Sequence, residues 1–331
     1  MNTPAFPPDA PLPRQVRLVE VGLRDGLQSV PTTLATDRKL ALLHALLAAG
    51  VRHVQVASFV NPNRVPQMAD AAALSVALRP LTDQYPDAVF SGLALNLRGV
   101  ERLAAAGLTN VDLSLSASEP HSRHNAGMSI TEATEQLTKS VHVAREFGLN
   151  VRAGVQCVFG SAPGEVIPIA RVTELATKLL DAGATELALA DSAGLADPVT
   201  LANTLEQVRQ AVGATPLTLH LHDTRGLGMA NLVTALRLGV SSFDTAFGGL
   251  GGCPFIPGAA GNIGTEDSIH VLHAMGVATG VDLTALARAT RQAEGWLNQA
   301  MPSRVYQLLR DGSYGDLEKV PQENRLATNS L

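Results

Sequence analysis

The chain has 331 residues, of which 46% are hydrophobic and 17% are charged, and its formal net charge is −5. This composition is typical of a soluble globular protein with one large core or two smaller ones. An acidic balance without a lysine or arginine cluster argues against a nucleic-acid partner, and apolar runs far below the ~20 residues of a membrane span argue against a membrane protein. The two cysteines, Cys157 and Cys253, make a disulfide framework improbable and favour a cytoplasmic protein.

The N-terminal residues 1–15 are rich in proline and lack the features of a signal or transit peptide, so we expect a flexible leader. After it, short β-rich runs alternate with longer segments that have helical apolar spacing. The expected strands are 16–23, 53–59, 89–95, 111–116, 151–159, 186–191, 217–222 and 243–247. The clearest helices are 36–49, 131–147, 168–182, 198–212 and 228–238.

Several of these helices end in a glycine, as a left-handed helix cap requires, and the next strand follows at once. The glycines are Gly50, Gly107, Gly148, Gly183 and Gly239. Eight strand–helix units over about 250 residues predict a (β/α)8 TIM barrel rather than an open doubly wound sheet. We assign residues 16–300 to the barrel domain, with C-terminal capping helices at 265–275 and 283–300, and residues 301–331 to a last helix at 303–310 and a tail.

Active sites of such barrels lie where the strands end at their C-terminal side, so polar residues there are the candidates. His220 and His222 stand on one face of the seventh expected strand, and two adjacent imidazoles suggest a metal. Asp25, at the end of the first strand, is the best third ligand, provided that the chain turns at Gly22 and Gly26 so that Arg24 also faces the mouth. The alternatives are one core and one solvated histidine, and a salt bridge between Arg24 and Asp25.

A glycine-rich run, residues 247–254, follows the eighth strand and suits a mobile loop that carries Cys253 as a reactive thiol. The alternative is a flexible loop with an incidental cysteine. Asn262, farther along the same segment, offers a neutral oxygen ligand.

Three motifs resemble those of the 3-hydroxy-3-methylglutaryl-CoA lyases, within a wider group of metal-dependent barrel lyases and Claisen-type synthases. They are Glu20-Val-Gly-Leu-Arg-Asp-Gly-Leu-Gln28, His220-Leu-His-Asp-Thr-Arg-Gly226 and the segment from Gly248-Gly-Leu-Gly-Gly-Cys-Pro254 to Asp267. The resemblance implies Mg2+ or Mn2+ bound by Asp25, His220, His222 and Asn262. It also implies retro-Claisen cleavage of a 3-hydroxy-3-alkylglutaryl-CoA to acetyl-CoA and a 3-keto acid, a reaction that for the methyl compound belongs to leucine degradation.

The same motifs suggest roles for the candidate side chains in this cleavage. Arg24 would hold the thioester oxygen and stabilise the enolate, and Cys253 would act as acid or base together with His220. Asp191 would orient a ligand histidine or relay a proton, and Glu20 would anchor Arg24. Expected substrate contacts are Gln28, Gln55 and Ser58, and by resemblance Arg123, His124 and Asn125 lie near the CoA nucleotide unless they form an ordinary polar loop.

Three positions depart from the family pattern: Gln55 replaces a glutamate, Ser29-Val30 replaces Asn-Glu, and Gly154 replaces a tyrosine. They suggest a related substrate with a larger C3 substituent, or citramalyl-CoA. Two other readings remain: a Claisen-type acyltransferase that runs in the condensing direction, and a barrel that binds acyl-CoA or metal without catalysis. We expect a homodimer or another homo-oligomer.

Overall fold

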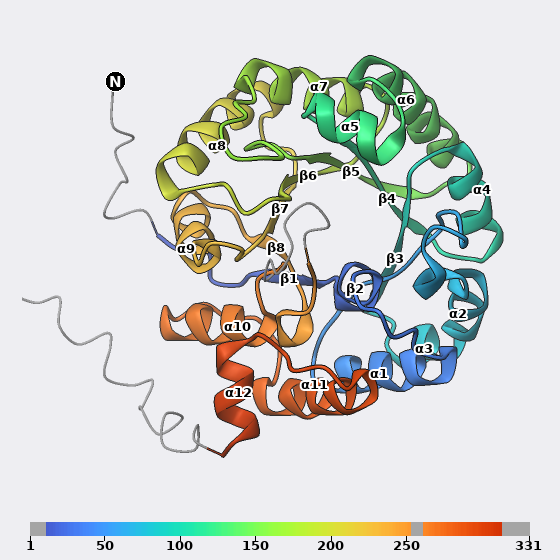
Figure 1. Cartoon of the computed structure of the whole chain (residues 1–331), viewed down its shortest axis with the longest axis vertical. Coiled ribbons are helices and arrows are strands. Elements are labelled where there is room, and N and C mark those ends of the chain that lie inside the picture. The colour runs from blue at the N-terminus through green and yellow to red at the C-terminus, as the bar shows by residue number, and fades with distance from the viewer. Residues whose placement is uncertain (1–10, 253–260, 313–331) are drawn as a thin grey trace, which may run out of the picture.

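Eight parallel strands form a closed barrel, in which each strand pairs with its neighbours in sequence and β1 pairs with β8 (Figure 1). The computed structural model describes residues 11–252 and 261–312. The expected TIM barrel is therefore confirmed. The strands are β1 (Arg17–Glu20), β2 (His53–Ser58), β3 (Val89–Ala94), β4 (Asn110–Ser116), β5 (Asn150–Gln156), β6 (Glu186–Asp191), β7 (Leu217–Leu221) and β8 (Ser242–Thr245).

Helices surround the barrel as an outer ring (Figure 1). The five helices expected from apolar spacing begin and end within one residue of their predicted limits: α1 (Thr36–Ala48), α6 (Ile130–Glu146), α7 (Ile169–Asp181), α8 (Pro198–Val212) and α9 (Gly228–Arg237). Helix α4 (Leu97–Ala105) ends just before Gly107, where a helix end was expected, whereas three short helices were not anticipated, namely α2 (Ala71–Ala77), α3 (Arg79–Gln84) and α5 (Glu119–Ala126). Within the described part of the chain, no helix is long and apolar enough to cross a lipid bilayer.

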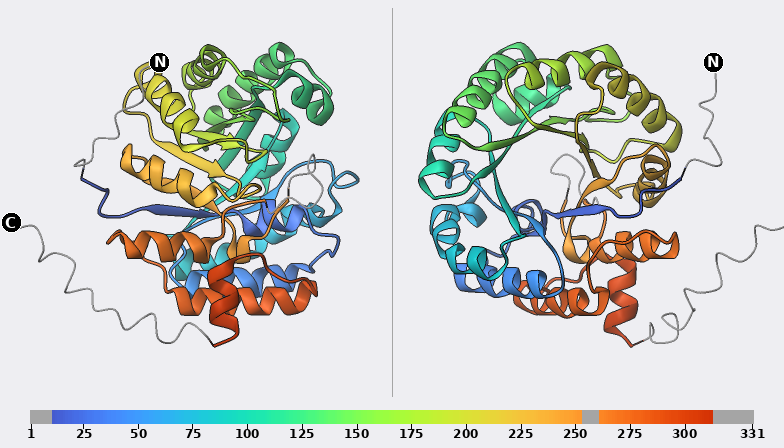
Figure 2. Two further views of the ribbon diagram at one scale, coloured as in Figure 1. Left: turned by 60° about the vertical axis from the view of Figure 1, so that its left-hand side comes forward. Right: turned by 180° about the vertical axis from the view of Figure 1, so that it is seen from behind.

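The C-terminal helices close the ring between α9 and α1, and both views of Figure 2 show them together on one side of the barrel. They are α10 (Thr265–Ala274), α11 (Leu283–Leu297) and α12 (Arg304–Arg310). The Ser303 amide at the start of α12 donates to the Gly248 carbonyl at 2.8 Å, which attaches this helix to the segment after β8. At the N-terminal end, Arg14 and Val16 hydrogen-bond to the backbone of Ala278, so these residues are fixed against the barrel.

Apolar side chains fill the space between strands and helices, where leucines and valines of β1–β8 meet those of the surrounding helices.

All five glycines predicted to end helices have a positive φ. Gly50 shows why glycine is needed: its φ is +98°, and a Cβ there would lie 2.2 Å from the carbonyl oxygen of Gly280. The Gly50 cap thus turns the chain from α1 into β2 within a few residues.

The barrel interior is polar, in contrast to the apolar layer outside the strands. Even-numbered strands contribute one layer, as alternate strands do in this fold, and it consists of Gln55, Asp112, Ala188 and Asp244. Arg152 from β5 bridges the two carboxylates, with its Nη1 2.6 Å from Asp244 Oδ1 and its Nε bonded to Asp112 Oδ1. This layer is the floor of the cavity described next.

Candidate active site

A cavity of about 680 Å³ opens at the C-terminal mouth of the barrel. Each of the eight strands, or the turn that follows it, contributes to its wall. Of the expected site residues, those that line it are Arg24, Asp25, Gln28, Gln55, Ser58, His124, Asn125, His220 and His222. Most of the candidates that were chosen for their position at strand ends therefore lie in one cavity.

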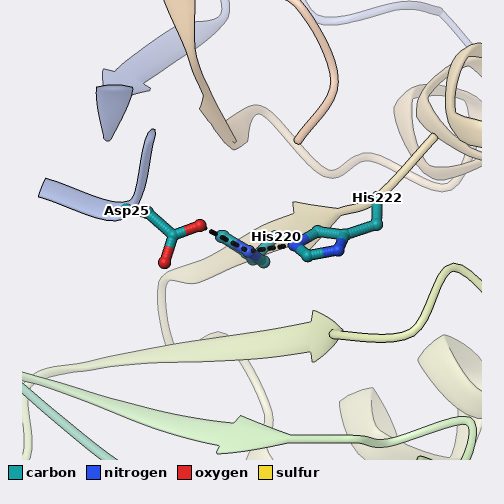
Figure 3. A group of neighbouring side chains, drawn as sticks. All are labelled: Asp25, His220 and His222. Carbon is teal, nitrogen blue, oxygen red and sulfur yellow. Dashed lines mark hydrogen bonds and ion pairs between the residues drawn. The ribbon is translucent and has the colours of Figure 1, made fainter. Parts of the chain in front are cut away.

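Asp25, His220 and His222 form a group that is suited to a metal ion (Figure 3). The two Nε2 atoms of the histidines are 3.0 Å apart, and Asp25 Oδ2 lies 3.9 Å from His220 Nε2. Neighbouring ligand atoms of an octahedral site with bonds of about 2.1 Å lie roughly 3 Å apart, which the two imidazole nitrogens match. The Asp25 oxygen lies farther away, but all three ligand atoms are within 4.8 Å of one another. Figure 3 shows His220 between the other two side chains.

The ionisation of these groups favours metal binding. Burial opposes the charge on Asp25, but the Arg24 guanidinium and the two imidazoles hold the pKa of this carboxyl below its usual range. Burial, reinforced by His220, lowers the pKa of His222 to about 3. At neutral pH the group is therefore a carboxylate beside a neutral imidazole, which are the ligand forms of both side chains.

Asn262 completes the donor set expected from the sequence. It pairs with His222 in an isolated β-bridge, and its Nδ2 donates to Asp25 Oδ2 at 2.8 Å. Its Oδ1 is buried and receives no hydrogen bond from any described residue, and the same is true of His222 Nδ1. An unused oxygen next to a carboxylate and two imidazoles is a donor set that fits Mg2+ or Mn2+.

Asp244, which the sequence reasoning missed, holds the histidine at the centre of this group. Burial opposes its ionisation, but Arg152 and His220 lower the pKa of Asp244 to about 2. An ionised carboxylate only accepts, so His220 Nδ1, 3.2 Å from Oδ2, carries the proton and donates it, which leaves the Nε2 lone pair for a ligand.

The expected orienting role of Asp191 differs from what the structure shows. Its two oxygens accept from the backbone amides of Leu195 and Ala196 at 2.8 and 3.0 Å, and burial raises its pKa. It shapes the turn after β6, whereas Asp244 orients His220.

Arg24 and Asp25 both face the mouth because β1 ends at Glu20 and residues Gly22–Gly26 form a π-helical turn. Adjacent residues of a regular strand would point to opposite faces, and the turn between Gly22 and Gly26, which was expected from these glycines, lets both side chains face the cavity. Arg24 donates from Nη1 to Asp25 and from Nε to Gln55 Oε1. Asp25 and Gln55 therefore fix the guanidinium at the cavity wall.

Glu20 does not anchor Arg24, contrary to the expectation. Its Oε1 accepts from the amides of Gly22 at 2.7 Å and Phe247 at 3.0 Å, and its Oε2 accepts from Thr265 Oγ1 at 2.7 Å. Burial raises its pKa to about 8. Glu20 thus ties the π-helical turn to the start of the glycine-rich segment.

The segment expected to contact a nucleotide is the short helix α5 rather than a polar loop. Ser118 caps it by accepting from the His121 amide at 3.3 Å. Arg123 is exposed and pairs with Glu119, whereas His124 and Asn125 face the cavity. The three expected residues are therefore divided between surface and cavity.

Two further expected contacts, Gln28 and Ser58, carry buried polar atoms that no described residue satisfies. Both line the cavity, and such orphaned groups in a cavity wall point to a polar ligand. Cys253 lies outside the described residues, so its expected role remains a prediction.

Asp112, Arg152 and Asp244, which were not among the expected site residues, share one sequence signal. Each is a charged residue inside a strand and directly follows a valine or phenylalanine, and both faces of a parallel sheet are expected to be buried. A charge at such a position needs a partner inside the barrel, and here the three residues are partners of one another.

Comparison with known proteins gives one consistent result. The family described as HMGL-like matches residues 15–292. A hydroxymethylglutaryl-CoA lyase of Bacillus subtilis is 35% identical over 300 residues, which cover 91% of this chain and 99% of the relative. An (R)-citramalyl-CoA lyase of Chloroflexus aurantiacus is 37% identical over 299 residues, which cover 88% and 93%. The structure of an HMG-CoA lyase from Acinetobacter baumannii in complex with coenzyme A and 3-methylmalate superposes with a TM-score of 0.84 at 33% identity, covering 93% of this chain and 98% of that one.

Proposed function

Because the chain belongs to the HMGL-like family, we propose that it is a carbon–carbon lyase that cleaves a 3-hydroxy-3-methylglutaryl-CoA-like thioester to acetyl-CoA and a 3-keto acid. The observation that carries this proposal is the group of Asp25, His220 and His222 in a cavity beside the Arg24 guanidinium. In the reaction, a base takes the C3 hydroxyl proton and the C2–C3 bond breaks. Its electrons form the thioester enolate, which then takes a proton on carbon.

The proposed cofactor is one divalent cation, Mg2+ or Mn2+, held by Asp25, His220, His222 and Asn262. When bound, it supplies Lewis acidity toward the C3 hydroxyl and the distal carboxylate of the substrate and lowers the pKa of that hydroxyl. The unused Asn262 Oδ1 and the Nε2 lone pair of His220, which the contact of Nδ1 with Asp244 leaves free, support this assignment.

Arg24 is the group proposed to bind the thioester oxygen. Its guanidinium is permanently charged, so it stabilises the enolate without exchanging a proton with it. Because Gln55 and Asp25 already hold the guanidinium, little reorganisation is needed when charge develops on the oxygen.

Proton transfer is proposed for Cys253, and His220 shares it only while its Nε2 is not bound to the cation. Asp244 keeps the proton of His220 on Nδ1, so Nε2 is the atom that can accept one when it is not coordinated. Cys253 would donate to the enolate carbon, as the family resemblance implies. The CoA portion would lie along His124 and Asn125, while the exposed Arg123 is left for the nucleotide phosphates.

The walls on β5 and β6 suggest the choice of substrate. Gly154, Ala188 and Ala190 leave space where larger side chains would reduce the cavity. We propose that a C3 substituent larger than methyl occupies this space, and the relative named for citramalyl-CoA supports a range of acyl groups in the family.

An acetyl-CoA release assay on a thioester panel tests the proposal. The panel holds the 3-methyl compound, longer 3-alkyl homologues and citramalyl-CoA, each assayed after chelation and after addition of Mg2+ or Mn2+. We expect cation-dependent cleavage with a longer 3-alkyl compound preferred. Cleavage of no member would contradict the proposed activity, and a clear preference for the methyl compound would contradict the substrate assignment alone.

We further propose that the enzyme acts in the cytoplasm, in leucine degradation or a related acyl-CoA route, and as a homodimer or other homo-oligomer. A low cysteine content, typical of a reducing compartment, supports the first point.

A further inference from the structure

The hydrogen bonds of Arg24 continue into the barrel floor. Its Nε donates to Gln55 Oε1, and Gln55 Nε2 donates to Asp112 Oδ2 at 2.6 Å. Gln55 and Asp112 are buried, with 1% and 5% of their surface exposed. The chain of contacts thus runs from the turn after β1, through β2, to a carboxylate on β4.

The amide of Gln55 can adopt only one orientation between these partners. A guanidinium only donates and a carboxylate only accepts, so Oε1 must face Arg24 and Nε2 must face Asp112. The negative charge behind the amide also polarises it, which strengthens Oε1 as an acceptor in this buried setting. Asp112 therefore gives a neutral glutamine part of the effect of a carboxylate on Arg24.

Asp112 is itself held by groups that leave no freedom to move. Its Oδ2 also accepts from Ser91 Oγ at 2.6 Å, and its Oδ1 accepts from Arg152 Nε. Although position 55 on β2 carries an amide, this wall of the barrel still contains a carboxylate, that of Asp112 on β4.

We propose that Asp112 is a positioning residue that orients and polarises Gln55 and thereby fixes Arg24 for the thioester oxygen. The inference rests on the proposed function, since Arg24 acts there on the developing enolate. Arg24 contributes mainly in the transition state, so a displaced guanidinium lowers kcat while KM changes little.

Asp112→Asn tests the chain of contacts without changing its shape. The new side chain has one oxygen and one NH2 group in place of two oxygens. If its oxygen faces Arg152, its NH2 group meets the NH2 group of Gln55, and if it is turned over, its NH2 group meets Arg152. If Gln55 is turned over instead, the NH2 group of Gln55 meets Arg24, so every arrangement places two donors in contact. We expect kcat to fall about 10- to 100-fold, as for the loss of an outer partner of a site residue, with KM within about threefold of the wild-type value.

Placing the carboxylate at position 55 instead of position 112 should restore activity. In the double variant Gln55→Glu with Asp112→Asn, the new carboxylate accepts from Arg24 and from the new amide nitrogen, and the new amide oxygen accepts from Arg152. We expect kcat at least about tenfold above that of Asp112→Asn. Gln55→Glu alone should be impaired, because it places two carboxylates in buried contact.

Glu186→Gln is the matched control. It makes the same carboxylate-to-amide change at a site paired with an arginine, Arg17, but at the opposite end of the barrel. We expect wild-type kcat for it, with thermal unfolding measured for every variant. Wild-type kcat in Asp112→Asn, or no rescue in the double variant, would overturn the inference.

The outcome separates this inference from the proposed function. If wild type cleaves thioesters and Asp112→Asn does so equally well, only the role of Asp112 fails. If wild type cleaves none, the proposed function fails. The crystal structure of Asp112→Asn then decides the positioning role, because we expect the Arg24 guanidinium to be displaced from its wild-type position, and an unchanged position would refute it.

Discussion

Asp244→Asn would reveal how strongly the buried carboxylate controls the proposed metal ligand. Asp244 divides its two oxygens between Arg152 Nη1, at 2.6 Å, and His220 Nδ1, at 3.2 Å. An asparagine retains one oxygen, which we expect to face the charged Arg152. The amide nitrogen then faces His220 Nδ1, and the imidazole must move its proton to Nε2 to accept from it. A protonated Nε2 cannot bind a metal.

The size of the effect follows from the single hydrogen bond involved. A hydrogen bond to a charged group contributes about 1.5–3 kcal/mol, and each 1.4 kcal/mol is tenfold in an equilibrium constant. We therefore expect the Kd for Mn2+ to rise about 10- to 100-fold, the range found when partners of metal-bound histidines are lost.

Calorimetric titration of the metal-free protein with Mn2+ measures this Kd directly. Glu186→Gln is again the control, and thermal unfolding identifies variants that fold poorly. A folded Asp244→Asn protein that binds Mn2+ within about threefold of wild type would show that His220 does not depend on Asp244 for its tautomer.

Two other substitutions test separate parts of the structure. Glu20 has its pKa raised by burial to about 8, so the stability that comes from its protonated form is complete below about pH 4.5 and is lost as the pH rises through 8. Urea unfolding at pH 5 and pH 8 should show a decrease in the free energy of unfolding for wild type that is larger, by on the order of a few kcal/mol, than for Glu20→Gln, and parallel curves would contradict this. For Gly154→Val, the new Cβ lies 3.2 Å from Ser114 Cβ, and the methyl groups would narrow the cavity. The ratio of kcat/KM for longer 3-alkyl substrates to that for the methyl compound should fall about tenfold or more, and an unchanged ratio would remove this wall from substrate choice.

The spacing of apolar residues predicted the barrel well, because the alternation of strands and helices along the chain is also the order in which they are arranged around the barrel. Helices such as α8, with Asp197 as cap and Pro198 in the first turn, carry their own boundaries in sequence. Helix α5 escaped notice because its residues are mostly polar and it has little apolar face to reveal it. The end of β1 was set by a π-helical turn whose hydrogen bonds no spacing rule anticipates.

For the site, sequence position indicated which side chains reach the mouth but not which partners they choose. Glu20 and Asp191 were expected to contact Arg24 and a histidine, yet both bind backbone amides. Which carboxylate meets which cation depends on the stagger of strands around the barrel, a property of the closed sheet rather than of any one segment. Asp244 meets His220 because β7 and β8 pair these two residues directly.

The five-residue turn after β1 has a consequence for the range of substrates. It carries both Asp25, a proposed ligand of the cation at the hydroxyl-bearing carbon, and Arg24, the proposed partner of the thioester oxygen. Since one rigid turn sets the distance between them, neither can shift without the other. We therefore expect substrates to share one spacing between the hydroxyl group and the thioester, and to differ only in the substituents on the hydroxyl-bearing carbon.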